Sequence, residues 1–345
     1  MKTIMKTLLV SIASLSLMLS VNAGELSVSG TAKATYNNSS GTAADQGLGV
    51  TNEINFTASG EMDNGYTWSY SMELDPASGG AANNDDTQIV LGLNDMGTIK
   101  VCVSECGNNK KYAWDNSAYT SMSDTGTSYG IVYPGDAGAA GTSTIQYHTP
   151  ELPLGTTVSF AYNTNMAGDA ASGNAAGSGG NSRDEYSIVS KPIDGLTLSA
   201  QYNSVNDYDD GVTTEQQQEE GGAYAAKYAV GNVTVGYGKS FQAPEITTVR
   251  VAGNDRGSAE YYENTGVSVG YAVNDDLSLS YTRETSERNL AHSPTVQYDV
   301  EMDSIQLAYS MGGATLSIAR ADVENANYEQ NYDVEETIIA MSFAF

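Results

Sequence analysis

The most regular feature of the sequence is an alternation of apolar and polar side chains that recurs from residue 24 to the C-terminus. In the last twelve residues, large apolar side chains occupy every second position from Ile339 to Phe345, and small side chains fill the positions between them. Because successive side chains of a strand point to opposite faces, this segment predicts a strand with one wide apolar face. A chain end normally frays into water, yet this one stops on Phe345. We therefore expect a closing strand of a barrel, with its apolar face against lipid.

Segments of the same kind run through the chain and predict about sixteen strands, an even number as in single-chain bacterial barrels. The predicted strands are 24–37, 50–63, 66–74, 88–93, 98–103, 143–149, 156–163, 185–191, 196–203, 222–230, 233–240, 263–273, 277–284, 303–310, 314–321 and 334–345.

The connections between these segments alternate between short turns rich in Asn, Asp and Gly and long polar loops. The long loops are 38–49, 75–86, 104–142, 164–183, 204–221, 241–262, 285–298 and 322–333. A β-sandwich would not separate short from long connections so regularly, and no repeated consensus indicates a solenoid. We expect an all-β transmembrane antiparallel β-barrel, with short periplasmic turns, long extracellular loops and a lumen wide enough for water.

The N-terminus has the features of a secretion signal. Lys2 and Lys6 precede an apolar stretch, and a small-residue cleavage site ends at Ala23. The apolar run is too short and too interrupted by serines for a membrane anchor. We therefore predict a signal peptide over 1–23, cleaved after Ala23, and a barrel domain over 24–345.

The charge balance is strongly acidic, with 42 Asp and Glu against 15 Lys and Arg in the whole chain. Loss of residues 1–23 removes two lysines and leaves a net charge of −29. Such a surface repels nucleic-acid phosphates, so we predict no nucleic-acid partner, and it attracts cations. A merely solubilising surface is the alternative. The 23 tyrosines suit the aromatic rings that border a membrane.

The strand number, the alternating connections, the terminal VEETIIAMSFAF and the very long third loop together resemble the general bacterial porins. The resemblance covers residues 24–345. It implies a homotrimer in the outer membrane with one pore in each subunit. It also implies that the third loop, 104–142, folds into the barrel and narrows the channel, and that the outer-membrane assembly machinery recognises Phe345.

In that family, acidic residues of the third loop face basic residues of the wall. Carried over here, the resemblance predicts a pore constriction made by Glu105, Asp115 and Asp124 with Lys33 and Lys100. The alternation also places other charges in the lumen, namely Glu53, Glu61, Glu73, Glu284 and Lys227. The sequence departs from the family in having no arginine cluster on its early strands. Each charge has the alternative of simply solvating a polar wall.

Three basic residues share the outward, lipid-facing side of their strands near the long loops: Lys239, Arg283 and Arg320. They are candidates for contact with lipopolysaccharide phosphates, with ordinary charge at the base of a loop as the alternative. Cys102 and Cys106 are disulfide candidates because they lie four residues apart in an exported protein.

The function predicted from these features is an outer-membrane channel for small hydrophilic solutes and ions, preferring cations. The alternatives are a substrate-selective channel and a secreted β-rich adhesin. His148 and His292 are the only histidines, and neither accompanies a nucleophile motif, so we predict no catalytic residue. We also predict no metal site and no cofactor.

Overall fold

The computed structural model describes residues 24–42, 44–76, 82–103, 108–120, 129–135, 143–163, 181–206, 217–246, 259–290 and 296–345. Residues 1–23 lie outside these ranges, so the cleaved signal peptide stays a prediction. No helix within the described ranges is both long and apolar enough to cross a membrane.

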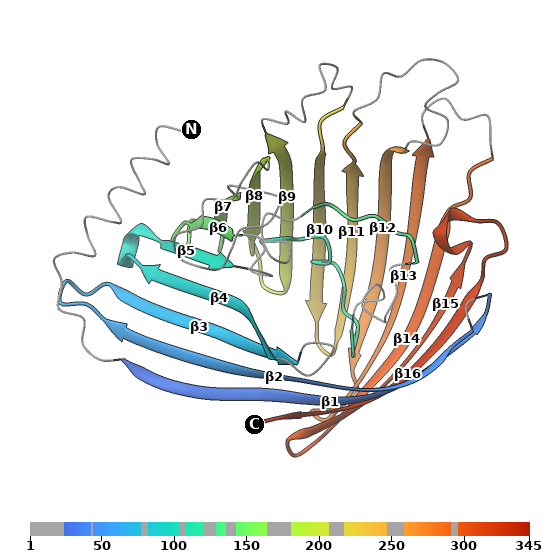
Figure 1. The fold of residues 1–345 in the computed structure, drawn as a ribbon, viewed down its shortest axis with the longest axis horizontal. Coiled ribbons are helices and arrows are strands. Elements are labelled where there is room, and N and C mark those ends of the chain that lie inside the picture. The colour runs from blue at the N-terminus through green and yellow to red at the C-terminus, as the bar shows by residue number, and fades with distance from the viewer. Residues whose placement is uncertain are drawn as a thin grey trace.

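The described chain is built almost entirely of β-strands (Figure 1). The strands are β1 (Glu25–Gly41), β2 (Gln46–Glu61), β3 (Thr67–Pro76), β4 (Ala82–Gly92), β5 (Thr98–Val103), β6 (Ser143–His148), β7 (Thr157–Asn163), β8 (Ser182–Ser190), β9 (Leu196–Asn206), β10 (Glu220–Val230), β11 (Val233–Ala243), β12 (Ala259–Ala272), β13 (Leu277–Leu290), β14 (Val300–Met311), β15 (Ala314–Glu324) and β16 (Val334–Ala344). Two short 3-10 turns complete the description, η1 (Asn94–Met96) and η3 (Ala326–Tyr328).

The sixteen strands close into one antiparallel barrel in which each strand pairs with its neighbours in sequence. β1 closes the ring by pairing with β16, from Thr31 opposite Ala344 to Gly41 opposite Val334. The chain end extends this seam, because the Phe345 amide donates to the Gly30 carbonyl at 3.0 Å and the Gly30 amide donates back at 2.8 Å. The prediction of a closing terminal strand is confirmed.

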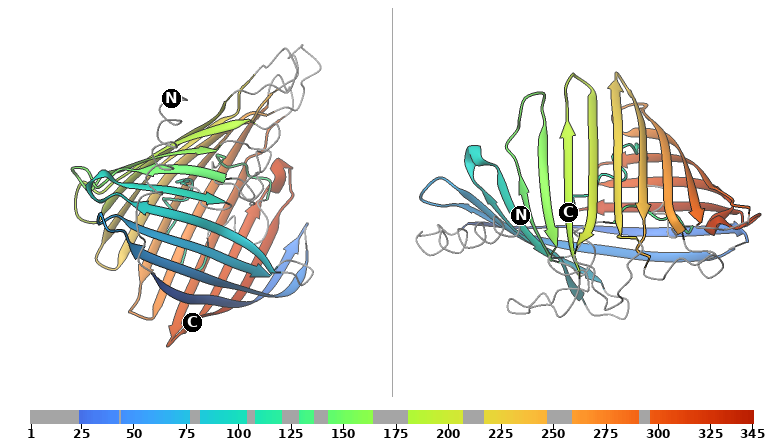
Figure 2. Two further views of the ribbon diagram at one scale, coloured as in Figure 1. Left: turned by 60° about the vertical axis from the view of Figure 1, so that its left-hand side comes forward. Right: turned by 90° about the horizontal axis from the view of Figure 1, so that it is seen from above.

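The short turns lie together at one rim of the barrel, and the strand ends that lead into the longer connections lie at the other rim (Figure 2). One of the two-residue turns joins β14 to β15 through Gly312 and Gly313, whose φ values are 55° and 99°. Both angles lie in the left-handed region, where glycine carries no steric penalty, and such turns suit the twist of a hairpin.

The alternation along the strands corresponds to an apolar outer face and a mostly polar inner face. On β16, Ile339, Met341 and Phe343 face outward and are 42%, 37% and 46% exposed, whereas Ala340 between them is 1% exposed. The same outward exposure recurs on most of the other strands at Leu26, Val28, Val50, Ile89, Val101, Phe160, Ile188, Leu198, Tyr224, Val235, Tyr237, Val267, Val269, Leu279, Tyr281, Ile305, Tyr309 and Ile318. An apolar outer band of this kind is the surface that a barrel presents to lipid.

Several strands extend further toward the long loops than the sequence predicts. β13 continues to Leu290 instead of ending at Glu284, and β14 begins at Val300 instead of Asp303. At the long-loop end of β14 the pattern reverses: Val300 and Met302 point inward and are fully buried, while Glu301 and Asp303 point outward. A prediction based on apolar outward positions stops where that reversal begins.

Candidate functional site

The third loop (104–142) is described over two stretches, the inner segment (108–120) and the return segment (129–135). The inner segment is held to the inward side chains of the wall from β7 to β14, beginning with Asn108 Nδ2, which donates to Ser159 Oγ on β7. The Lys110 amide donates to Gln201 on β9 at 2.5 Å, the Ala118 amide donates to Ser280 on β13 at 2.8 Å, and the Tyr119 amide donates to Gln306 on β14 at 2.8 Å. Figure 1 shows this trace crossing the inner side of β10 to β13. The inner segment of the loop therefore lies inside the barrel, as predicted.

A single tryptophan fixes the middle of the inner segment. Trp114 is 4% exposed, and its ring lies on Gly238 and Gly266, at neighbouring inward positions of β11 and β12. A methyl group added to either glycine would overlap with the ring. Ser268 Oγ also donates to the Trp114 carbonyl at 2.7 Å. These two glycines face each other on adjacent strands, and because neither has a side chain, they leave a recess in the wall that accepts the indole.

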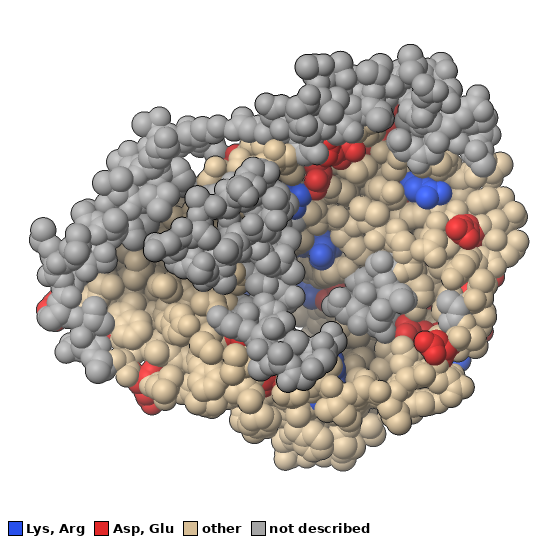
Figure 3. All heavy atoms as spheres, viewed as in Figure 1, with Lys and Arg blue, Asp and Glu red and all other residues tan. Residues whose placement is uncertain are grey.

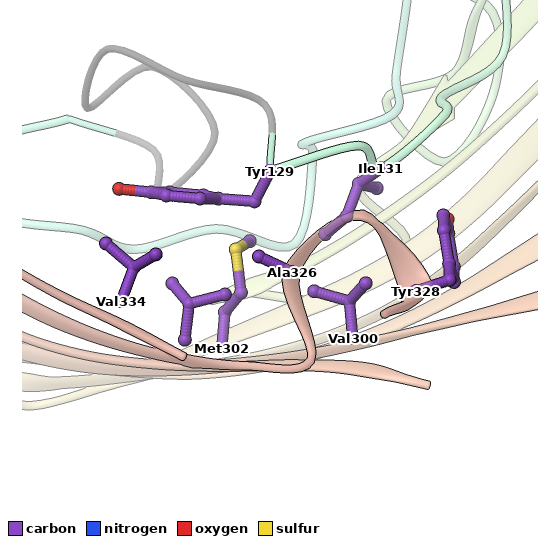
Figure 4. Close-up of a cluster of buried hydrophobic side chains, with 8 residues drawn as sticks. Tyr129, Ile131, Val300, Met302, Ala326, Tyr328 and Val334 are labelled. Atoms are coloured by element: carbon purple, nitrogen blue, oxygen red, sulfur yellow. The ribbon is translucent and has the colours of Figure 1, made fainter. Parts of the chain in front are cut away.

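The return segment is held by an apolar cluster inside the barrel (Figure 4). Tyr129 and Ile131 of the loop face inward side chains of β14 to β16 and the η3 turn. The buried members of the cluster are Tyr129, Ile131, Val300, Met302, Val323, Ala326, Tyr328 and Val334. Two polar contacts border the cluster: Tyr129 Oη donates to Glu336 at 2.5 Å, and the Asn327 amide donates to the Tyr129 carbonyl at 2.7 Å. The last long loop, which contains η3, therefore holds the third loop in place.

Charged groups of the wall meet the inner segment at two described points. Lys33 Nζ of β1 lies 5.7 Å from the centroid of the Tyr119 ring. Asp115 interacts electrostatically with Lys227 of β10, and its carboxylate accepts hydrogen bonds from the Ser117 amide at 2.9 Å and hydroxyl at 2.7 Å. Burial raises the pKa of Asp115, although these hydrogen bonds and the Lys227 charge act in the opposite direction.

A buried carboxylate lies beneath the return segment. Glu284 on β13 is 2% exposed and accepts a hydrogen bond from Tyr133 Oη at 2.9 Å. Burial and the adjacent Glu284 charge raise the pKa of Tyr133 well above its usual value, so the hydroxyl stays protonated and remains a donor.

A family model described as Gram-negative porin matches residues 8–310 of the sequence. The chain belongs to the Gram-negative porin family. It is therefore an outer-membrane channel, and the alternative of a secreted adhesin does not hold. Among curated proteins, none matches the sequence.

Solved structures similar to this porin agree on the fold. OmpF of Salmonella typhi in complex with daunomycin shares 15% identity at a TM-score of 0.68, over 95% of this chain and 100% of that chain. The anion-selective porin from Comamonas acidovorans shares 12% identity at a TM-score of 0.64, over 93% and 100%. A loop L8 deletion mutant of OmpT of Vibrio cholerae shares 11% identity at 0.65, over 94% and 100%. At these identities the likeness establishes the barrel fold alone.

The pore constriction of this porin stays a prediction, and only some of its predicted residues lie in the described part of the chain. Lys33 meets the third loop through Tyr119, but the basic residue beside Asp115 is Lys227, which was predicted only as a general lumen charge. Lys100 of β5 acts electrostatically on His148 at the end of β6. Glu105 and Asp124 lie outside the described residues, so their role stays a prediction.

The other lumen charges lie on inward positions of β2 and β3. Thr31 Oγ1 donates to Glu53 at 3.2 Å across the β1–β2 pair. Glu61 ends β2 near the short-turn rim and Glu73 lies on β3 beside Asn55. Cys102 is buried and disulfide-bonded, with its sulfur 3.2 Å from Thr144 Oγ1. Cys106, the other cysteine of the sequence, lies outside the described residues, so its pairing with Cys102 rests on the sequence alone.

The three candidates for lipopolysaccharide contact do face outward, and each is already paired with carboxylates. Lys239 pairs with Glu263, Arg283 with Glu301 and Asp303, and Arg320 with Asp322 and Glu335. A lipid phosphate would have to compete with these partners. Lipopolysaccharide contact therefore stays a prediction, and the structure adds no support for it.

The sequence reasoning missed the groups that position the third loop. Glycines at neighbouring inward positions of β11 and β12 were a signal for the Trp114 recess, because an ordinary polar wall would carry Ser or Thr there. Val300, Met302, Val323 and Val334 were a second signal, since apolar residues at inward positions need a partner inside the barrel. That partner, Tyr129 with Ile131, is far away in sequence and has no periodic pattern.

Proposed function

We propose that this porin is a water-filled diffusion channel for small hydrophilic solutes and ions, with an overall preference for cations. The observation that carries the proposal is the closed ring of sixteen strands with the third loop held against one inner wall. Such a loop narrows the lumen without filling it. The net charge of −29 for residues 24–345, and carboxylates such as Glu53 on the inner wall, support the preference for cations.

We also propose that the protein assembles as a homotrimer after removal of residues 1–23, and that Phe345 is recognised during its insertion by the outer-membrane assembly machinery. Membership of the Gram-negative porin family supports the trimer, the removal of the signal and the recognition of Phe345. The pairing of Phe345 with Gly30 is consistent with a terminal residue that belongs to the barrel seam.

Planar-bilayer recording of the refolded full-length barrel domain tests these proposals together. We expect conductance steps that open and close in threes, and a reversal potential of cation sign under a potassium chloride gradient. A reversal potential of anion sign overturns the cation preference. Single steps without any grouping overturn the trimer, and the absence of steps from protein with the circular dichroism of folded β-sheet overturns the channel.

A second candidate is a substrate-selective channel. The observation in its favour is a set of three partly buried tyrosines in the third loop, Tyr112, Tyr119 and Tyr133. Tyr133 also packs against Tyr112, with ring centroids 5.0 Å apart. Solute-induced block of the current by one chemical class, and not by others of equal size, would distinguish this candidate from a general channel.

A further inference from the structure

Three neighbouring turns of the short-turn rim carry exposed apolar side chains. These turns join β4 to β5, β6 to β7 and β8 to β9. We call their exposed apolar residues the apolar rim sector: Met96 at 54%, Leu152 at 40%, Leu154 at 66% and Ile193 at 60% exposure. The four other short turns have only polar residues and glycine at their tips, which are 63–65, 231–232, 274–276 and 312–313. The rim is therefore apolar at its turn tips over one sector only.

Hydrogen bonds join the three turns into one surface. Tyr147 Oη of β6 donates to the Met96 carbonyl at 2.8 Å. The Leu154 carbonyl accepts the Lys191 amide at 3.0 Å and the Ser190 hydroxyl at 3.2 Å, and both donors come from the end of β8 and the turn that follows it. The apolar side chains thus belong to adjoining turns whose positions are fixed relative to one another.

Leu154 has two features that are unfavourable for a residue surrounded by water. Its φ of 65° lies in the left-handed region, where a bulky residue is an outlier, and its apolar side chain is 66% exposed. The hydrogen bonds to its carbonyl explain the backbone conformation but not the side chain. Gly or Asn adopts that conformation more readily and would leave the same carbonyl in place. An apolar partner that covers the side chain accounts for the leucine.

The apolar rim sector continues the outer, lipid-facing band of the barrel. Leu152 forms a β-bridge with Thr156, whose hydroxyl lies 2.9 Å from that of Ser190. Ser190 lies opposite Leu198, an outward residue that is 41% exposed. Among the residues drawn in colour in Figure 3, charged side chains are sparse and uncharged ones form most of the surface. The lipid-facing surface of β7 to β9 therefore runs without a break into the tips of these turns.

Outward tyrosines show where the band ends on the other side of the rim. Tyr228, Tyr271 and Tyr309 are each about two-fifths exposed, and each precedes a polar turn tip by three residues. Such rings favour the boundary between membrane and water, which places the polar tips in water. On β6 Tyr147 occupies the corresponding position, but Leu152 follows it further along the hairpin. Apolar contact in this sector extends beyond the level that the tyrosines mark.

We propose that the apolar rim sector dips among the acyl chains of the phospholipid leaflet on the short-turn side, and holds this part of the barrel deeper in the membrane than the rest of the rim. The occupant is lipid because the sector is continuous with the lipid-facing band. Glu151, Lys191 and Asp194 flank the sector and are exposed, which suits the headgroup level, where a charge costs little. This inference goes beyond the proposed function, since it concerns membrane contact and not conduction.

A dye attached to the rim tests where the sector lies. Leu154→Cys and the control Asn232→Cys, at a polar turn tip, are labelled with a nitrobenzoxadiazole dye without reductant, so that the disulfide-bonded Cys102 is left unmodified. The refolded full-length barrel domain is placed in phosphatidylcholine vesicles. We expect phosphatidylcholine with a nitroxide on its acyl chain to quench the dye at position 154, and aqueous iodide to quench the dye at position 232.

Leu154→Asn separates lipid contact from an uncovered turn. If the side chain lies in water, Asn should leave stability unchanged or raise it, because Asn adopts a left-handed backbone more readily than Leu. In vesicles we expect the opposite, a lower urea concentration at the unfolding midpoint, since a polar amide replaces an apolar group among acyl chains. Asn232→Ser should keep the wild-type midpoint.

Two results overturn the proposal. Iodide quenching at position 154 as strong as that at position 232 shows that the sector is open to water, and leaves it available to a protein on that side of the membrane. A midpoint for Leu154→Asn at or above that of the wild type also overturns it, because lipid contact then contributes no stability. Failure of the proposed channel is seen separately, as folded protein without conductance steps, and does not bear on this contact.

Discussion

Trp114 determines where the inner segment lies, because its ring fits a recess that Gly238 and Gly266 leave open. We expect Gly266→Ala to push the ring off the wall into the lumen and lower the single-channel conductance, at a cost of about 1–3 kcal/mol for overpacking. Trp114→Ala should have the opposite effect, with a larger and noisier conductance and a loss of roughly 3–5 kcal/mol from the cavity. Bilayer recording and denaturant unfolding measure both effects.

Gly47→Ala is the matched control, since no atom lies within 4 Å of a methyl group added there. Conductance and stability of this variant should equal those of the wild type. Equal conductance of Gly266→Ala and Trp114→Ala would show that the recess does not position the loop.

We expect Asp115 to give the ion preference of the channel a pH dependence. Burial raises its pKa above the ordinary value of 3.8, so it gains its proton at a higher pH than an exposed Asp does. Acidification therefore removes a negative charge beside Lys227 while exposed carboxylates are still ionised, and the cation preference should fall in that range. Reversal potentials measured from pH 7 downward should show this fall in cation preference in the wild type. The Asp115→Asn variant should lack it, because its cation preference is already lower at pH 7. Identical pH profiles for the two proteins would contradict the assignment.

At the scale of elements, the η3 turn and β16 together hold the return segment of the third loop. Tyr129→Ala removes the ring from the apolar cluster and one hydrogen-bond donor from Glu336, whose other described donor is Asn37 at 2.5 Å. We expect the loop to lose roughly 3–5 kcal/mol of stability in its docked position. Greater current noise and faster tryptic cleavage after Lys110 and Lys111 should follow. Tyr129→Phe keeps the ring and should cost about 1–3 kcal/mol.

Tyr309→Ala is the control for this prediction, because Tyr309 lies on the outer face of β14 and is 41% exposed. Its current noise and cleavage pattern should match those of the wild type. A Tyr129→Ala protein as quiet and as resistant to trypsin as the wild type would show that the loop is held elsewhere.

The reversal of the side-chain pattern marks the height at which β14 leaves the membrane. Ile305 faces outward with 66% of its surface exposed, as lipid contact requires, but Glu301, four residues nearer the long-loop rim, is an outward carboxylate. A charge at the centre of the bilayer is costly, whereas one beyond the interface is not. In lipid vesicles, a membrane-impermeant maleimide should therefore label Glu301→Cys and not Ile305→Cys. Both should react after unfolding in urea, and equal labelling in vesicles would place the boundary elsewhere.

At the scale of the whole molecule, the barrel itself was predictable because the alternation of side chains within each strand shows which of its faces points outward. Ile339, Met341 and Phe343 identify the outer face without reference to any neighbour, and β5 begins and ends where its alternation does. The path of the third loop was not predictable in this way. Its contacts join residues such as Trp114 and Gly266, or Tyr129 and Glu336, that are distant in sequence and whose pairing depends on the closed ring.

Ionic strength determines how far the net charge of residues 24–345 acts. With 42 acidic residues on a barrel, fixed carboxylates are spread over wall, rim and loops, and their combined field reaches the lumen only over the Debye length. That length is about 10 Å at 0.1 M salt and about 3 Å at 1 M, so the cation preference should decline steeply between these concentrations. Reversal potentials at a fixed twofold gradient, centred first near 0.1 M and then near 1 M potassium chloride, measure this decline. A cation preference that persists unchanged at 1 M would instead arise from a few carboxylates in direct contact with the permeating ion. The selectivity would then belong to the constriction and not to the acidic surface as a whole.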